Sequence, residues 1–218
     1  MRVAVIVPIF NEGKHLEKLI KDFRQTGHPV FIVDDGSTDI TTQKLKLSRL
    51  PKNIKVIRHV VNLGKGAAMK TGVQAAFTLG FDAVIFMDGD GQHASSDIKK
   101  FTNRLKTFDV VLGERKPNGN MRLHLAKLAA YLTSMLYGIK TNDLLCGFRG
   151  FTKKVYRLIR WNSVGYGVET EMVIRTGINK LKYTVVPVET LYLDVYKGFN
   201  ISDGFRILVN IIYWRFTI

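Results

Sequence analysis

The chain has 218 residues, of which 46% are hydrophobic and 23% are charged, a composition typical of a folded globular protein and not of a disordered one. Its 33 Lys and Arg against 18 Asp and Glu give a formal net charge of +15, which favours polyanionic partners such as nucleic acid, an anionic membrane or phosphate-bearing substrates. The single cysteine excludes an intramolecular disulfide, and the longest run without a charge, residues 128–139, is shorter than the ~20 residues of a membrane-spanning helix.

The first half of the sequence alternates between two hydrophobic periods. Short, β-branched apolar runs predict buried parallel strands, and between them apolar residues recur at helical spacing, as in residues 16–23. The predicted strands lie at residues 3–8, 30–33, 54–59, 83–87 and 110–113. This repeated strand–helix–strand order predicts an α/β fold with a Rossmann-like, mostly parallel sheet and helices on both faces.

The second half is less regular. We expect a helix with an apolar packing stripe over residues 121–135, a short strand at 147–151, a helix at 170–178 and a strand at 183–189. Apolar residues at helical spacing from Ile201 to Phe216 then predict a C-terminal amphipathic helix. The sequence contains no repeat or linker, so we divide it into a main domain over 1–195 and an amphipathic segment over 196–218.

Polar or glycine-rich clusters follow the five strands of the first half. They begin at Asn11, Asp34, Asn62, Asp88 and Gly113. Ligands of parallel α/β sheets bind at the carboxyl ends of the strands, so these clusters predict one site along one edge. Acidic pairs in two of the five exceed what turn chemistry requires.

Asp88 and Asp90 are separated by one residue directly after an apolar strand. If both carboxylates face one point, they form a hard-oxygen site suited to Mg²⁺ or Mn²⁺, which can bridge a diphosphate and neutralise its charge as it leaves. The alternative is an Asp-Gly-Asp-Gly turn without a ligand, because Asp and Gly dominate turns. Taken alone, the motif does not decide between the two.

Two further clusters suit a nucleotide. Asp34 and Asp35 can accept hydrogen bonds from a base or a ribose, while a residue of 37–39 caps the next helix. Residues 64–66, Gly-Lys-Gly, open a helix whose N–H groups and lysine can hold phosphate oxygens. The sequence here follows neither G-x-x-x-x-G-K-[ST] nor G-x-G-x-x-G, which argues against a P-loop hydrolase or a dehydrogenase.

Four segments in this order resemble successive motifs of the family 2 glycosyltransferases, in particular the polyprenyl-phosphate sugar synthases such as dolichyl-phosphate mannose or glucose synthase. The segments are residues 7–12, 33–39, 62–68 and 88–93. The similarity extends over residues 3 to about 190 and implies a GT-A-type catalytic domain. It also implies an inverting transfer of mannose or glucose from a nucleotide diphosphate donor to a polyprenyl or dolichyl phosphate, with residues 88–90 as the metal motif.

The resemblance implies roles residue by residue. The residues implied in donor binding are Pro8, Phe10, Glu12, Asp34, Asp35, Lys65, Asp88, Gly89, Asp90, Gln92 and Arg115. Those implied in holding Mg²⁺ or Mn²⁺ are Asp88, Asp90 and Gln92, and those implied in catalysis are Asp90, Arg115, Arg149 and Glu171. The family often has Tyr at the position of Phe10 and Ser at the position of Glu114.

Three of these roles can be made more specific. Arg115 is expected to bind phosphate of the donor, and Arg149 phosphate of the acceptor. Residues i and i+2 of a helix do not share a face, so only one of Glu169 and Glu171 should point into the site, and we expect Glu171. His93 is not expected to act as a base, because a phosphate monoester is already anionic at neutral pH.

The expected partners are GDP-mannose or UDP-glucose, a polyprenyl phosphate and a membrane surface. The C-terminal helix alone is typical of an ordinary packing element, but the positive charge favours a cytoplasmic protein bound peripherally to the cytoplasmic face of a membrane. Nucleic acid is not expected, since the acidic pairs would repel a phosphate backbone. Two enzymatic alternatives stay open: a family 2 transferase with a soluble glycan or protein acceptor, and a nucleotide-sugar pyrophosphorylase.

Overall fold

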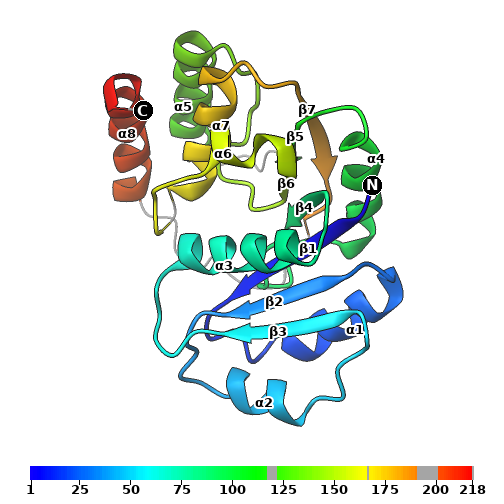
Figure 1. Cartoon of the computed structure of the whole chain (residues 1–218). Coiled ribbons are helices and arrows are strands. Elements are labelled where there is room, and N and C mark those ends of the chain that lie inside the picture. The colour runs from blue at the N-terminus through cyan, green and yellow to red at the C-terminus, as the bar shows by residue number, and fades with distance from the viewer. Residues whose placement is uncertain (117–121, 166, 191–200, 218) are drawn as a thin grey trace.

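The computed structural model describes residues 1–116, 122–165, 167–190 and 201–217 (Figure 1). Within these ranges seven strands form one sheet in the order β3-β2-β1-β4-β6-β5-β7. The strands are β1 (Val3–Ile9), β2 (Val30–Asp34), β3 (Ile54–Arg58), β4 (Ala83–Phe86), β5 (Val110–Arg115), β6 (Arg149–Thr152) and β7 (Tyr183–Val188). β6 runs antiparallel to both β4 and β5, and every other pairing is parallel. The predicted mostly parallel sheet is confirmed.

The helices connect these strands. They are α1 (Leu16–Thr26), α2 (Thr41–Leu47), α3 (Lys65–Thr78), α4 (Ile98–Arg104), α5 (Arg122–Tyr137), α6 (Tyr156–Ile159), α7 (Val168–Ile178) and α8 (Ile201–Thr217), with single 3-10 turns at Ser95–Asp97 and Lys153–Val155. The sequence predicted five of them from their apolar spacing and a further helix after residues 37–39, where α2 lies. It missed α4 and α6, which have seven residues or fewer and so show too few turns for a clear helical period.

The core has two layers, one on each face of the sheet. Successive side chains of a strand point to opposite faces, so Val5 packs on one layer while Ile6 packs on the other. The layer that contains Val5 is covered by α1 and α4, and the layer that contains Ile6 by α3, α5, α7 and α8 (Figure 1). Helices therefore cover both faces, as the sequence predicts.

The C-terminal helix α8 packs against this second layer. Ile207, Ile211 and Trp214 are buried, and the Tyr137 hydroxyl of α5 donates a hydrogen bond to the Ile211 carbonyl. None of the helices within the described ranges is long and apolar enough to cross a bilayer. The predicted boundary between residues 195 and 196 lies outside the described residues.

Candidate active site

Asp88 lies at the centre of the cluster at the carboxyl end of β4. Its Oδ1 atom is 2.6 Å from Nζ of Lys65, whose ammonium is also 2.6 Å from Oε1 of Glu169. Its other oxygen, Oδ2, is 3.9 Å from Nε2 of the buried His93. Burial alone would raise the pKa of Asp88, but the Lys65 ammonium and the His93 ring hold that pKa well below its usual range. Asp88 is therefore a carboxylate at neutral pH.

Asp90 is the second acidic residue of this turn. Its Oδ1 accepts a hydrogen bond of 2.9 Å from the backbone N–H of Gln92. Burial first, and then the negative charge of Asp88, raise the pKa of Asp90 above its usual value. Between them stands Gly89, where a Cβ would lie 2.3 Å from Cγ2 of Ile9. The turn thus packs directly on β1, and it brings the two carboxylates close enough to repel each other.

This repulsion is what a divalent cation would relieve, so the pair fits the predicted metal. No cluster of three or more His, Cys, Asp or Glu side chains suited to a metal occurs in the part of the chain that the structure describes. Among these described residues, the site therefore offers two carboxylates rather than a complete cage. Mg²⁺ is commonly held in this way in phosphate-handling enzymes, where substrate phosphates and water supply the remaining oxygens.

Asp35, predicted to contact the nucleotide, fastens the loop after β3. Its Oδ1 is 2.7 Å from Nδ1 of His59 and accepts a bond of 3.0 Å from the Leu63 N–H, while its Oδ2 accepts one of 2.8 Å from the Gly64 N–H. Nε2 of His59 lies 2.9 Å from the Thr71 hydroxyl on α3. Asp35 therefore shapes the wall of the site, and contact with a nucleotide stays a prediction.

Asp34 lies beside it and is fully buried. It accepts bonds from the Ser37 N–H at 2.9 Å and the Thr42 hydroxyl at 3.2 Å, and Nε of Arg58 lies 3.3 Å from its Oδ2. The carboxylate is thus engaged in closing the turn between β2 and α2. Its predicted role in donor binding likewise stays a prediction.

The residues predicted on β1 lie at the same edge of the sheet. Pro8 pairs with Val33 of β2, and Phe10, the next residue after β1, leaves 40% of its surface exposed. Oε2 of Glu12 is 4.0 Å from the His15 ring. These positions are compatible with a nucleotide pocket beside the Asp88 cluster.

The Gly-Lys-Gly turn differs from the prediction. The N–H of Gly66 donates to the Val164 carbonyl at 2.9 Å, and a Cβ on Gly66 would stand 2.2 Å from the Ser163 carbonyl oxygen. The N–H of Gly64 is already bonded to Asp35. The expectation that the N–H groups of these two glycines hold phosphate is therefore wrong, because a neighbouring loop occupies the place. Lys65 instead extends to Asp88.

Arg115 forms a bidentate ion pair with Asp143. Its Nε is 2.7 Å from Oδ2 and its Nη2 is 3.0 Å from Oδ1. Burial lowers the pKa of Arg115, but its hydrogen bonds and charge pairing with Asp143 outweigh burial and raise it, so the guanidinium stays charged. Glu114, at the position where the family often has Ser, accepts bonds from the Asn142 backbone and side chain. Both residues hold the segment that leads to β6.

Arg149 was expected to bind an acceptor phosphate, and the structure contradicts this. The side chain is 1% exposed, and its guanidinium donates to the carbonyl oxygens of Leu144, Cys146 and Glu169. No surface remains on which a phosphate could bind. Arg149 is a structural residue that ties the segment before β6 to the start of α7.

Of the two glutamates on α7, Glu169 and not Glu171 reaches the site. Glu169 pairs with Lys65, as described above. Glu171 accepts bonds from the N–H groups of Asn162 and Ser163 and from Nε of Arg175. The two side chains diverge, as their spacing predicts, but Glu169 and not the expected Glu171 lies in the Asp88 cluster.

Two residues that received no role from sequence reasoning also build the site. Asn11 has a left-handed backbone, with φ of 57°, and its Oδ1 accepts bonds from the N–H groups of Thr38 and Asp39. It joins the loops after β1 and β2, and its position directly after a strand was the available signal. Gly147 packs against the Asp88 carboxylate, a proximity that no local pattern reveals.

Comparison with known proteins identifies the family. The model of Glycosyl transferase family 2 matches residues 4–176. The UDP-N-acetylglucosamine–dolichyl-phosphate N-acetylglucosaminyltransferase of Methanococcus voltae is 29% identical over 237 residues, which cover 96% of this chain and 94% of that protein. The polyprenol monophosphomannose synthase of Mycolicibacterium smegmatis is 28% identical over 223 residues, covering 93% and 84%.

The solved structures agree on the fold. Glucosyl-3-phosphoglycerate synthase from Mycobacterium tuberculosis, in complex with Mn²⁺, UDP and glucosyl-3-phosphoglycerate, superposes with a TM-score of 0.72 at 20% identity, covering 100% of this chain and 80% of that one. At this identity the likeness concerns the GT-A-like fold. The family match removes the nucleotide-sugar pyrophosphorylase from the alternatives. The chain belongs to glycosyl transferase family 2 and is a glycosyltransferase.

Proposed function

We propose that this glycosyltransferase moves a hexose or an N-acetylhexosamine from a nucleotide diphosphate donor to a polyprenyl phosphate at a lipid surface. The observation that carries the proposal is the carboxylate pair Asp88 and Asp90 at the carboxyl end of β4, where burial and the charge of Asp88 disfavour ionisation of Asp90. Such a pair is suited to a divalent cation and a diphosphate. The names of the two relatives, which cover nearly the whole chain, support a lipid-linked phosphate as acceptor.

The donor would lie along the carboxyl ends of β1 and β2. The exposed ring of Phe10 offers a face for a nucleotide base, and Pro8, Glu12 and the loop held by Asp35 line the same edge. The two relatives are named for different sugars, N-acetylglucosamine and mannose. GDP-mannose, UDP-glucose and UDP-N-acetylglucosamine are therefore all candidate donors.

The reaction would be one in-line displacement. An oxygen of the acceptor phosphate attacks the anomeric carbon while the bond from that carbon to the donor diphosphate breaks, which inverts the anomeric centre. A divalent cation held by Asp88 and Asp90, with Gln92 beside them, would supply positive charge to the leaving nucleoside diphosphate. The attacking oxygen is already anionic, so no general base is required and His93 needs no proton-transfer role.

The chain's own cations would orient the two anionic substrates. Arg115 keeps 34% of its side-chain surface exposed although Asp143 fixes its direction, so part of the guanidinium is available to a phosphate. Two anions must approach each other in this reaction, and fixed positive charge lowers the cost of that approach. Arg149 has no part in this step.

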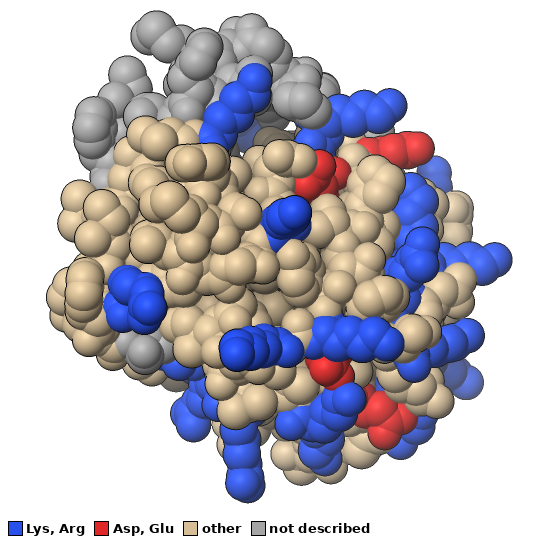
Figure 2. All heavy atoms as spheres, turned by 90° about the horizontal axis from the view of Figure 1, so that it is seen from above, with Lys and Arg blue, Asp and Glu red and all other residues tan. Residues whose placement is uncertain are grey.

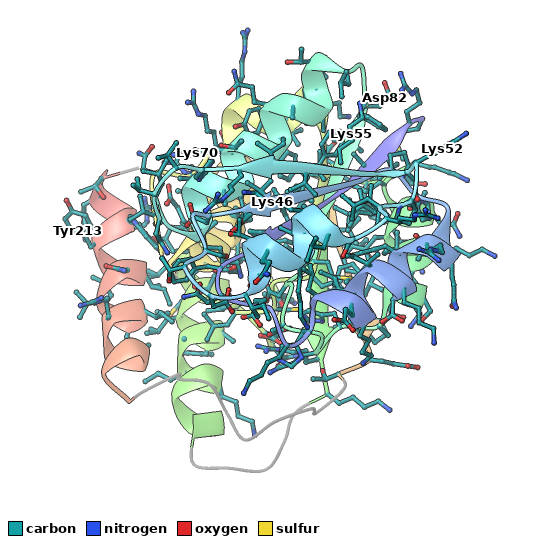
Figure 3. All side chains as sticks on the ribbon, turned by 90° about the horizontal axis from the view of Figure 1, so that it is seen from below. Lys46, Lys52, Lys55, Lys70, Asp82 and Tyr213 are labelled. Atoms are coloured by element: carbon teal, nitrogen blue, oxygen red, sulfur yellow. The ribbon has the colours of Figure 1, made fainter. Side chains whose placement is uncertain are left out.

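The lipid surface would be met by the α5–α8 face, the exposed apolar side chains of these two helices. They are Leu128, Tyr131 and Met135 of α5 and Val209, Ile212, Tyr213 and Phe216 of α8. α5 contains no Asp or Glu, and in Figure 2 the surface on the side of α8 is mostly uncharged, with scattered Lys and Arg. Tyr213 projects outward from α8, away from the sheet (Figure 3). Apolar and aromatic residues with nearby cations are typical of helices that lie in a bilayer interface.

The test is to incubate the protein with Mn²⁺ or Mg²⁺, vesicles that contain a polyprenyl phosphate, and each of the three donors in turn. We expect a lipid-linked sugar from one donor, lost in Asp90→Asn and on chelation of the metal. Transfer to a water-soluble phosphate or glycan, with none to the lipid, would overturn the acceptor assignment. Full activity of Asp90→Asn would overturn the role of the carboxylate pair.

A further inference from the structure

Lys65 holds a position between two carboxylates that do not belong to the same element. Its Nζ lies 2.6 Å from Asp88, just after β4, and 2.6 Å from Glu169 on α7. Lys65 is the first residue of α3, and the residues on both sides of it are fixed: Gly64 by Asp35 and Gly66 by the Val164 carbonyl. The backbone at Lys65 is thus fixed, and the flexible side chain places the ammonium within reach of both carboxylates.

The contact matters because Asp88 is one of the two proposed metal ligands. The Oδ1 atom of Asp88 is already paired with the Lys65 ammonium, and Gly147 packs against the carboxylate on another side. A cation that approaches Asp88 meets a positive charge already bound there. Two cations at such short range repel strongly even when partly solvated, so both cannot keep full contact with Asp88.

Glu169 is a second ion-pair partner for the Lys65 ammonium. Its side chain is 3% exposed, and a carboxylate so deeply buried requires a positive partner. When Lys65 leaves Asp88 it can therefore remain with Glu169 instead of moving into solvent. The two carboxylates share one ammonium, and only one of them lies in the metal motif.

We propose that Lys65 is an internal counter-ion that competes with the divalent cation for Asp88, and that Glu169 retains Lys65 once the cation has bound. The inference rests on the proposed metal site at Asp88 and Asp90. It makes Lys65 and Glu169 positioning residues that set how tightly the enzyme binds metal before any donor arrives. The site then binds the divalent cation tightly only when a donor diphosphate supplies additional oxygen ligands.

The test measures Mn²⁺ binding in the absence of donor, from the electron paramagnetic resonance signal of the free ion. Lys65→Met removes the competitor, and we expect the Kd to fall about tenfold. Glu169→Gln removes the alternative partner, and we expect the Kd to rise several-fold. The double variant Lys65→Met with Glu169→Gln removes both but keeps the net charge of the wild type, and it avoids an unpaired buried carboxylate. It should still bind Mn²⁺ more tightly than the wild type, which a change in net charge cannot explain.

Lys70→Met is the matched control, because it removes the same charge from the same helix. Its Kd should equal that of the wild type. If the double variant binds Mn²⁺ no more tightly than the wild type, the competition does not exist. If Asp88→Asn binds Mn²⁺ as the wild type does, the metal is held elsewhere, and the proposed metal site fails together with the inference.

A second readout follows Lys65 itself. Its side chain is 27% exposed, so acetylation by a water-soluble reagent can be followed by mass spectrometry with Lys70 as the internal reference. In Glu169→Gln, Mg²⁺ should raise the acetylation of Lys65 several-fold, since the ammonium then has neither carboxylate. In the wild type the increase should be smaller. Equal acetylation with and without Mg²⁺ in Glu169→Gln would contradict the displacement.

Discussion

Gly147 lies so close to Asp88 that a Cβ added at Gly147 would stand 2.1 Å from Oδ2 of the carboxylate. No side chain larger than hydrogen fits there without moving Asp88. The need for glycine at this position is thus set by close approach and not by backbone conformation. The segment before β6 therefore helps to fix the direction of a carboxylate in the turn that follows β4.

Gly147→Ala should displace the Asp88 carboxylate and lower kcat/KM about a hundredfold, the cost typical of an ångström-scale misplacement in an active site. Gly165→Ala is the matched control, because a Cβ there has no heavy atom of the described chain within 4 Å. We expect the control to keep its activity. Comparison of kcat/KM and Tm for the two variants tests the prediction, and wild-type activity of Gly147→Ala would contradict it.

The pair of Arg115 and Asp143 predicts a dependence of stability on pH. Burial tends to raise the pKa of Asp143, but the Arg115 guanidinium holds it below the unfolded value of about 3.9. The pair therefore stabilises the fold above that unfolded pKa, and the contribution is lost as pH falls through the lower, folded pKa.

Asp143→Asn should consequently reduce the free energy of unfolding by about 1–3 kcal/mol at pH 7, less than for a fully buried pair because Arg115 is partly exposed. The difference from the wild type should shrink below pH 4. Urea unfolding between pH 7 and pH 3 measures it, with Asp22→Asn on α1 as a charge-matched control. A difference that stays constant down to pH 3 would show that the charge of Asp143 is not what stabilises the fold.

Arg149→Met should lower the free energy of unfolding by about 3–5 kcal/mol, since the carbonyls of Leu144, Cys146 and Glu169 would lose their buried donor. Arg160→Met removes an exposed arginine and should change stability little. Thermal unfolding measures both variants.

The milder Arg149→Lys separates stability from binding. If Arg149 is structural, this variant should lower Tm and leave the KM for the acceptor unchanged. An increased acceptor KM with an unaltered Tm would restore the phosphate-binding role that the geometry of Arg149 excludes.

The contrast between Asp88 and Arg149 shows what the sequence can predict. Asp88 follows a short apolar run with a clear period, and the carboxyl ends of parallel strands share one edge, so its neighbourhood can be predicted from the order of elements. Arg149 follows Gly147 and Phe148 in a segment without hydrophobic periodicity, so the sequence does not indicate whether its side chain is buried. Its burial depends on the nearby carbonyls of Leu144 and Cys146 and on the carbonyl of Glu169 on α7, which meet the guanidinium only in the folded chain.

The choice between Glu169 and Glu171 failed for a related reason. Two residues at positions i and i+2 of a helix point in different directions, so the sequence predicts that the two glutamates diverge. Which of them faces the site depends on the rotation of α7 about its own axis. That rotation is set by packing: Val168, Met172 and Val173 lie in the core layer beneath α3 and β4. Similarly, the Gly-Lys-Gly turn taken alone is suited to a phosphate. In the folded chain, residues 163–164, which come about a hundred positions later in the sequence, occupy the space where that phosphate would lie. Sequence therefore predicts which turns meet, and tertiary contacts decide which side chains face the ligand.

The α5–α8 face gives the last prediction. Ile212 is 52% exposed on α8, and an isoleucine that enters the bilayer interface gains about 1.5–3 kcal/mol from burial at most. Ile212→Glu removes that gain and adds a charge that anionic lipids repel, so binding to vesicles rich in anionic lipid should weaken at least about tenfold. Sedimentation with vesicles measures the partition.

Leu47→Glu is the control for this change, because Leu47 is more exposed still, at 76%, and stands on α2, far from α8 (Figure 1). Both variants lose one apolar side chain and gain one negative charge, so a general effect of net charge would weaken them equally. Lysines also lie on the side of α2 and β3, such as Lys46, Lys52 and Lys55 in Figure 3. Attraction of anionic lipid to the whole positive surface is therefore the alternative to a contact through α8. A loss of vesicle binding confined to Ile212→Glu assigns the contact to α8, and equal losses would leave attraction by the whole charged surface as the cause.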